Sequence, residues 1–336
     1  MKRHPNWRAA ILFGVCLSTA ACPPSRAGRT AADGPAISEA QHQFDAGNYS
    51  AVISALQPVV SQNPSDGAAY YWLGRSYYEL RDYDNAVASA EKSVAIDPKN
   101  SLYHQRLGQA YGGKADVDRS FSMARKVKKE FETAVSLDPS NIQARRDLEE
   151  FCLEAPWIVG GSKDEAMQQV DAIAATDPVQ GHLARAVYFH DAKENDQAEN
   201  EYKQVLAAKP QKPDPYFEVA DFYFEQSQPA GIETAVQAAA AVSPTDPRIL
   251  FYRGVEGVIA NQNLPDAERN LKAYLATSPD RSDWPAHASA RAWLGRLYEL
   301  QGKTTDAVEQ YRAALQLNPR RKDARERLQK LGASSQ

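Results

Sequence analysis

The chain has 336 residues, of which 43% are hydrophobic, so it can bury the core of one large domain or two ordinary ones. Its 39 Lys and Arg residues are outnumbered by 43 Asp and Glu, which leaves a formal net charge of -4 and no net attraction to polyanions; we expect no nucleic acid partner. Three cysteines are too few for a disulfide framework or a cysteine metal cluster.

The first 21 residues have the pattern of an export signal. A basic head, "MKRHPNWR", precedes a charge-free apolar run from Ala9 to Ala21 that is too short to span a bilayer stably. We therefore expect residues 1–21 to be a signal peptide and the Pro- and Gly-rich residues 22–34 to be a flexible tether.

The end of this signal, "LSTAAC", resembles the lipobox of bacterial lipoproteins, whose cysteine is acylated and becomes the new N-terminus. The resemblance implies a lipid anchor at Cys22, although Thr19 stands where that family usually has Leu. The alternative is secretion after cleavage at a nearby alanine, with Cys22 discarded or left free. With the anchor, the protein is expected on the periplasmic side of a bacterial membrane.

Proline-containing turns recur along the rest of the chain. They fall at Pro64, Pro98, Pro139, Pro178, Pro210, Pro244, Pro279 and Pro319, with steps of 34, 41, 39, 32, 34, 35 and 40 residues. A period of this length is the signature of a repeat array. Two stretches also have similar sequences: "WLGRSYYELRDYDNA" begins at Trp72 and "WLGRLYELQGKTTDA" at Trp293.

These blocks resemble the tetratricopeptide repeat, a pair of helices with small residues at their crossing. Gly74 and Ala86 are expected at the close approach of one pair, and Tyr77 on the face turned to the next pair. The resemblance implies an all-α, right-handed superhelical solenoid of helix-turn-helix repeats. We expect about eight repeats over residues 35–321, followed by a charged capping helix and tail over 322–336.

Two of the repeats are longer than the others. We expect residues 112–122 and 154–166 to enlarge the turns between the helices of neighbouring repeats, and therefore to emerge side by side on one edge. In the second turn, Ser162 and Glu165 form an S-x-x-E capping box. Trp157 and Ile158 either fold back on the solenoid, which the rarity of exposed apolar patches favours, or wait for a partner.

The resemblance also implies where a partner binds, because the first helix of each repeat lines a concave groove in this family. The corresponding positions are Tyr71, Arg75, Tyr78, Glu79, Phe217, Asp221, Phe224, Glu225, Phe251 and Val255. Aromatic, apolar and acidic groups suit an extended or helical protein segment with apolar anchors and some Lys or Arg. If the helix register is shifted by one residue, Phe251 and Val255 are core residues instead.

No enzyme motif is present. "GGSK" at Gly160 and "GKT" at Gly302 lack the earlier glycine of a phosphate loop, and the six histidines have no ligand spacing. We therefore expect no catalytic residues, no metal site and no cofactor. The sequence predicts a scaffold that binds protein or peptide partners in the cell envelope. The alternative is a periplasmic receptor for peptides or cell-wall fragments, with the 154–165 loop as a lid.

Overall fold

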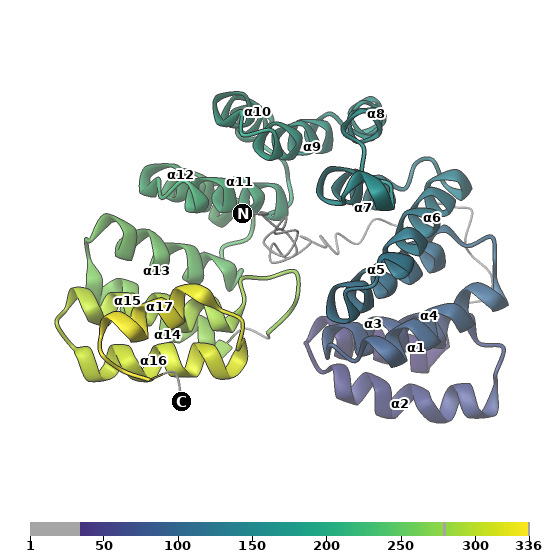
Figure 1. The fold of residues 1–336 in the computed structure, drawn as a ribbon, viewed down its shortest axis with the longest axis horizontal. Helices are drawn as coiled ribbons and strands as arrows, with labels where there is room; N and C mark the ends of the chain where they lie inside the picture. The colour runs from purple at the N-terminus through teal and green to yellow at the C-terminus, as the bar shows by residue number, and fades with distance from the viewer. Residues whose placement is uncertain (1–33, 278–279, 335–336) are drawn as a thin grey trace, which may run out of the picture. The chain divides into compact units, whose positions relative to one another are not determined.

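The computed structural model describes residues 34–277 and 280–334, and these residues form α-helices, one short 3₁₀ turn and no strand (Figure 1). The predicted signal peptide, Cys22 and residues 23–33 of the tether lie outside the described part of the chain. The expected all-α fold is confirmed.

The helices group into two compact units, which meet in the sequence between Tyr202 and Lys203. Unit 1 holds α1 (Pro35–Asp45), α2 (Tyr49–Gln62), α3 (Gly67–Glu79), α4 (Tyr83–Ile96), α5 (Ser101–Asp118), α6 (Phe121–Leu137), α7 (Ile142–Glu154), the 3₁₀ turn η2 (Trp157–Val159), α8 (Lys163–Thr176) and α9 (Pro178–Asp191). Helix α10 (Asn195–Ala208) contains the boundary. Unit 2 holds α11 (Asp214–Glu225), α12 (Pro229–Val242), α13 (Arg248–Ala260), α14 (Leu264–Thr277), α15 (His287–Leu300), α16 (Thr304–Leu317) and α17 (Lys322–Lys330).

Within each unit the helices stack in chain order as hairpins. Each helix contacts the next, and the first helices of successive hairpins also contact one another: α1, α3, α5, α7 and α9 in unit 1, and α11, α13 and α15 in unit 2. We call the surface shared by these odd-numbered helices the first-helix face of each unit. Because contacts reach only neighbouring hairpins, each unit has the architecture of a solenoid.

The helix ends follow from local sequence signals. The second helix of a hairpin stops two residues before a proline, as α4 does at Ile96 before Pro98, because the residue before proline avoids the helical region. In unit 1 the next helix, α3, α5, α7 or α9, then begins on a side-chain cap. For example, the Ala69 backbone N–H donates to Asp66 Oδ1 at 2.9 Å and starts α3.

The close approach predicted within a hairpin is present in the second one. A Cβ atom built on Gly74 would lie 3.4 Å from the Ala86 carbonyl oxygen, and Ala86 is completely buried. Tyr77 packs against the cores on both sides of its hairpin, and its hydroxyl accepts a hydrogen bond from Gln57 Nε2 at 3.0 Å. Small residues therefore lie at the crossing of the two helices, and the aromatic residue joins the repeats.

The third hairpin differs from the expectation in one respect. Residues 112–118 were expected in an enlarged turn, but they extend α5 by nearly two turns to Asp118. Only glycine fits at position 113, because the Tyr83 ring occupies the space beside it, with Cε1 2.3 Å from where a Cβ would lie. Lys114 Nζ, next along the helix, contacts the carboxylates of Asp84 and Asp118. Packing against α4 thus overrides the helix-breaking tendency of two glycines.

Candidate functional site

The four predicted groove residues of unit 1 lie on α3, on the first-helix face. Arg75 is only 8% exposed, and its guanidinium lies 4.1 Å from the centre of the Phe44 ring and 4.6 Å from that of Trp72. Tyr71, Tyr78 and Glu79 are half-buried beside it. Aromatic rings therefore hold the Arg75 guanidinium in place, so this side chain is not a flexible surface group.

A second arginine from the neighbouring first helix meets this group. Arg106 on α5 is 5% exposed, and both it and Arg75 act on the Tyr71 phenol. Burial would raise the pKa of Tyr71, but the positive charges and hydrogen bonds of the two arginines outweigh it, so the pKa lies below its usual value. Burial in turn lowers the pKa of Arg75.

Several donor groups of these arginines are unused. Nε of Arg75, and Nε and Nη1 of Arg106, are buried and have no hydrogen-bond partner. A buried donor without an acceptor costs about 1–3 kcal/mol, so such groups are rare in a finished interior. All three donor atoms are enclosed where α3 meets α5, so the groups of this face that another molecule can reach are the half-buried Tyr71, Tyr78 and Glu79.

The polar character continues onto α7. The side-chain amides of Gln105 and Gln109 donate to the same oxygen of Asp147, at 2.7 and 2.8 Å. Burial raises the pKa of Asp147 in spite of these donors. We call the set Tyr71, Arg75, Gln105, Arg106, Gln109 and Asp147 the polar seam of unit 1.

Two further carboxyl groups, those of Glu150 and Glu154, follow Asp147 on α7. Burial, followed by the neighbouring charge of Glu154, raises the pKa of Glu150 well above its usual value. Burial, followed by the charge of Asp191, raises the pKa of Glu154 to about 7. The first-helix face of unit 1 therefore carries cationic groups on α3 and α5 and weakly acidic carboxyls on α7.

In unit 2, three of the predicted contact residues are core residues. Phe217, Phe251 and Val255 are at most 2% exposed, so the expectation that they contact a partner is wrong. Phe217 stacks on Tyr252 with ring centres 5.6 Å apart, and Phe251 packs edge-on against the same ring. For Phe251 and Val255 the alternative helix register, which places both side chains in the core, is therefore the correct one.

The other three predicted residues of unit 2 remain partly accessible. Asp221, Phe224 and Glu225 are half-buried on α11. Asp221 accepts a hydrogen bond from the Tyr252 hydroxyl at 2.6 Å, and burial raises the pKa of its carboxyl to about 7. Phe224 packs edge-on against Phe251 and Trp293. This part of the face offers a narrow strip rather than an open groove.

The turn after α7 also departs from the favoured expectation. Trp157 and Ile158 do not fold back on the solenoid: 84% and 51% of their surfaces are exposed. In a 3₁₀ turn three consecutive side chains point in three directions, and here Val159 takes the buried one. Ser162 caps α8 as predicted, but Glu165 contacts Lys128 instead of completing the capping box.

This turn is fixed on the neighbouring hairpin. Lys128 Nζ donates to the Gly160 carbonyl at 2.9 Å, and Arg125 Nη2 donates to the Ile158 carbonyl at 3.3 Å. The two longer repeats are therefore adjacent at one edge, as expected. Gly161 has no room for a side chain, since a Cβ there would lie 1.7 Å from the Ala155 carbonyl oxygen. A loop anchored in this way is not built to open as a lid.

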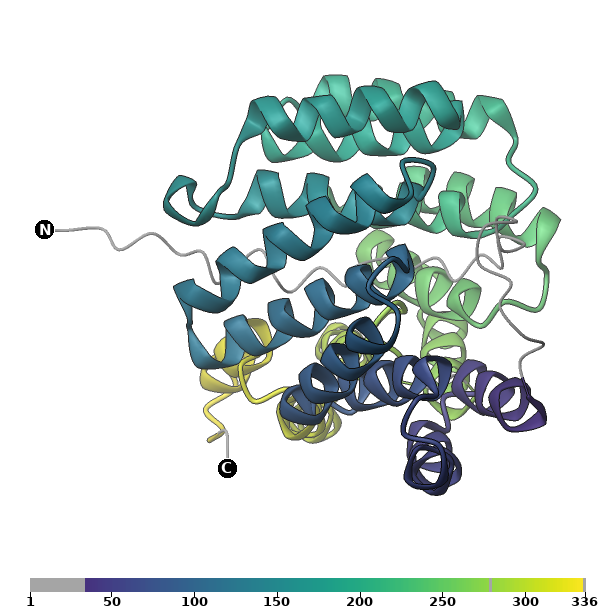
Figure 2. The same ribbon diagram turned by 90° about the vertical axis from the view of Figure 1, so that its right-hand side faces the viewer.

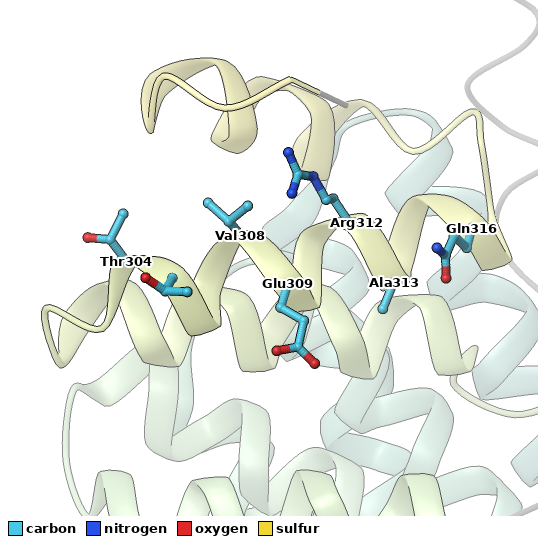
Figure 3. Close-up of a pocket in the computed structure, with 7 residues that line it drawn as sticks. Thr304, Val308, Glu309, Arg312, Ala313 and Gln316 are labelled. Atoms are coloured by element: carbon cyan, nitrogen blue, oxygen red, sulfur yellow. The ribbon is translucent and has the colours of Figure 1, made fainter. Parts of the chain in front are cut away.

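A hollow lies on α16. Its lining comes from that one helix and includes Thr304, Val308, Glu309 and Gln316 (Figure 3). Arg312 Nε in the same stretch donates to the carbonyl of Ser334 in the C-terminal segment, at 3.2 Å. These side chains are largely exposed and lie along a single helix. The hollow is explained by the packing of the C-terminal segment on α16.

The sequence interpretation missed Arg106 and the two glutamines of the seam. The glutamines could have been found, because Gln105 and Gln109 lie one 34-residue repeat after Tyr71 and Arg75. Arg106 could not be found in this way, since the equivalent position in the preceding repeat is the buried Trp72.

Comparison with protein families agrees with this architecture. A family model described as tetratricopeptide repeat matches residues 37–101 and 258–322, one stretch in each unit. The chain therefore contains tetratricopeptide repeats, a module that generally mediates protein–protein interaction.

Curated relatives match over a short stretch. The cellulose synthase operon protein C of Escherichia coli (strain K12) and its putative counterpart in E. coli O157:H7 are each 42% identical over 57 residues. The match covers 17% of this chain and 5% of either relative.

Solved structures show the same fold at low identity. A tetratricopeptide repeat protein from Parabacteroides merdae has a TM-score of 0.50 and 15% identity, over 80% of this chain and 97% of that one. The Cut9–Hcn1 hetero-tetramer of the APC/C matches with a TM-score of 0.51 and 14% identity, over 88% of this chain and 55% of that one. This chain thus spans about half of the latter's length.

Proposed function

We propose that this protein is a scaffold for protein partners in the bacterial cell envelope, and that a partner segment binds along the first-helix face of unit 1. The repeat architecture supports protein binding in general. The half-buried Tyr71, Tyr78 and Glu79, which lie beside the buried Arg75 on α3, are the observation that supports this face in particular.

The seam suits a segment that brings a hydrogen-bond acceptor. A carboxylate of the segment would be attracted by the positive charges of Arg75 and Arg106, which lie beside Tyr71. The half-buried rings of Tyr71 and Tyr78 lie on the same helix as Arg75 and provide apolar contact area.

The envelope location is supported by the N-terminal sequence. The basic head, the apolar run to Ala21 and the cysteine that follows fit export and acylation at Cys22. None of the described helices is long and apolar enough to cross a bilayer. The short match to a protein named for a cellulose synthase operon is compatible with an envelope role.

Crosslinking in the native cells, followed by fractionation, tests both parts of the proposal. The wild-type chain should be recovered with the membranes together with a defined envelope protein. Arg106→Gln should weaken capture of that protein about tenfold, or about 1.4 kcal/mol, because the seam loses its charged donors. Cys22→Ala should move the chain to the soluble fraction.

The control variant is Lys99→Gln, which removes an exposed cation from the turn before α5. Far-UV circular dichroism should show that both glutamine variants remain helical. Equal capture by Arg106→Gln and Lys99→Gln would rule out the seam, and membrane recovery of Cys22→Ala would rule out the lipid anchor.

A further inference from the structure

Four large apolar side chains are exposed together where the two longer repeats meet. Val117 and Phe121 flank the turn between α5 and α6, with 51% and 53% of their surfaces exposed, and Trp157 and Ile158 lie on η2. Figure 2 shows the α5–α6 turn and the turn after α7 at the same edge of unit 1, at the left of that view. We call these four residues the edge patch.

The exposure of the edge patch is built into the fold. Backbone hydrogen bonds close the turn from both sides, with the Ser162 N–H donating to the Cys152 carbonyl at 2.8 Å and the Gly161 N–H to the Pro156 carbonyl at 3.2 Å. Gly160 adopts a φ of 112°, a backbone conformation that favours glycine, and its carbonyl is held by Lys128. Trp157 therefore stands out from an ordered turn.

The surroundings of the patch are basic in a chain that is acidic overall. Residues 114–129 contain six Lys or Arg; Lys114 and Lys128 are paired with the carboxylates of Asp84, Asp118 and Glu165, and the others make no ion pair within the described part of the chain. Arg119 is exposed in the turn beside Phe121, and Lys126 and Lys129 are exposed on α6. The exposed apolar groups thus lie beside positive charge.

The shape of the patch favours a surface over a single inserted side chain. The hollow under it is lined by Ala115, Phe121, Phe151 and Val159 among others, and its volume is about 100 Å³. Ligand pockets usually offer about 300–1,000 Å³. Trp157 projects beyond this hollow instead of lining it, so the patch is a ridge with a shallow hollow beside it.

We propose that the edge patch docks on a membrane surface that contains anionic phospholipid, with Trp157 and Ile158 in the headgroup region. Tryptophan is enriched at this depth because its ring is apolar and its N–H is polar, and nearby Lys and Arg are attracted to anionic headgroups.

The inference rests on the proposed lipid anchor. Eleven residues separate Cys22 from Gly34, so the tether spans at most about 40 Å and would keep unit 1 near the bilayer. The patch would then orient unit 1 on a membrane to which the chain is already attached.

Fluorescence quenching by brominated lipid tests the contact on the full chain. The probes are vesicles of brominated phosphatidylcholine with and without phosphatidylglycerol. On the anionic vesicles, Trp157→Phe should remove a quenched component of about one quarter of the emission, because Trp157 is one of the four tryptophans that follow Cys22. This component should be smaller without phosphatidylglycerol and at high salt.

The matched control is Trp284→Phe, which removes a half-buried tryptophan of unit 2 and should leave the quenched component unchanged. If wild type and Trp157→Phe are quenched to the same extent, membrane docking is wrong and the patch is available to a protein partner. Failure of the lipid anchor is detected separately, by sedimentation. Without an anchor, a chain from which the apolar N-terminal run has been removed would not sediment with vesicles, whether or not Trp157 is quenched in the full chain.

Discussion

Asp221 is the single residue whose ionisation should most affect unit 2. Burial raises its pKa to about 7, above the ordinary value of 3.8, although the Tyr252 hydroxyl and the charge of Arg248 act in the opposite direction. The folded state therefore retains a proton that the unfolded state releases near pH 4. Consequently, this residue lowers stability progressively as the pH rises from about 4 to about 7.

Asp221→Asn should remove this part of the pH dependence. Because Asp221 is only half-buried, we expect the difference in unfolding free energy between pH 5 and pH 8 to shrink by about 1–2 kcal/mol. Urea unfolding followed by circular dichroism measures it. Glu309→Gln, which removes an exposed carboxyl on α16, should follow the wild type, and an unchanged difference in Asp221→Asn would contradict the assignment.

At the scale of the element, two glycines with the same sequence context should respond oppositely to alanine. Gly74 and Gly108 both follow a leucine in the first helix of a repeat. A Cβ on Gly74 meets its nearest atoms at 3.4 Å, whereas one on Gly108 would lie 2.5 Å from Cε1 of the buried Phe131 ring. The first distance is ordinary contact and the second is a clash.

Gly74→Ala should therefore be neutral or stabilise by up to about 1 kcal/mol, through helix propensity. Gly108→Ala should destabilise by about 1–3 kcal/mol, through overpacking. Thermal unfolding of both variants compares them directly. Phe131→Leu combined with Gly108→Ala should recover part of the loss; an additive loss would show that the ring is not the cause.

The helices themselves were largely predictable, because their signals are local. Pro98 ends α4 through the backbone of its own neighbours, and Asp66 caps α3 from three residues away. The extension of α5 was not predictable, since it depends on packing against α4: the Tyr83 ring, thirty residues earlier, lies against Gly113, and Lys114 contacts Asp84. The buried state of Phe217 was missed for the same kind of reason: its stacking partner Tyr252 comes from the next hairpin.

At the scale of the whole molecule, the helices of each unit contact their neighbours in the stack, so stability should be local along the chain. Helix α17 ends the stack of unit 2. Its Leu328 is completely buried, and its Arg327 Nη1 lies 3.4 Å from Glu299 Oε2. Leu328→Ala should cost about 2–5 kcal/mol in the last hairpin. Native-state hydrogen exchange should then accelerate in α16 and α17 and remain unchanged in α1–α8, since no packed interaction carries the loss that far. Glu326→Ala, an exposed change on the same helix, should leave both regions as they are. Uniform acceleration through both units would mean that the chain unfolds as one cooperative body and that its hairpins do not act as nearest neighbours.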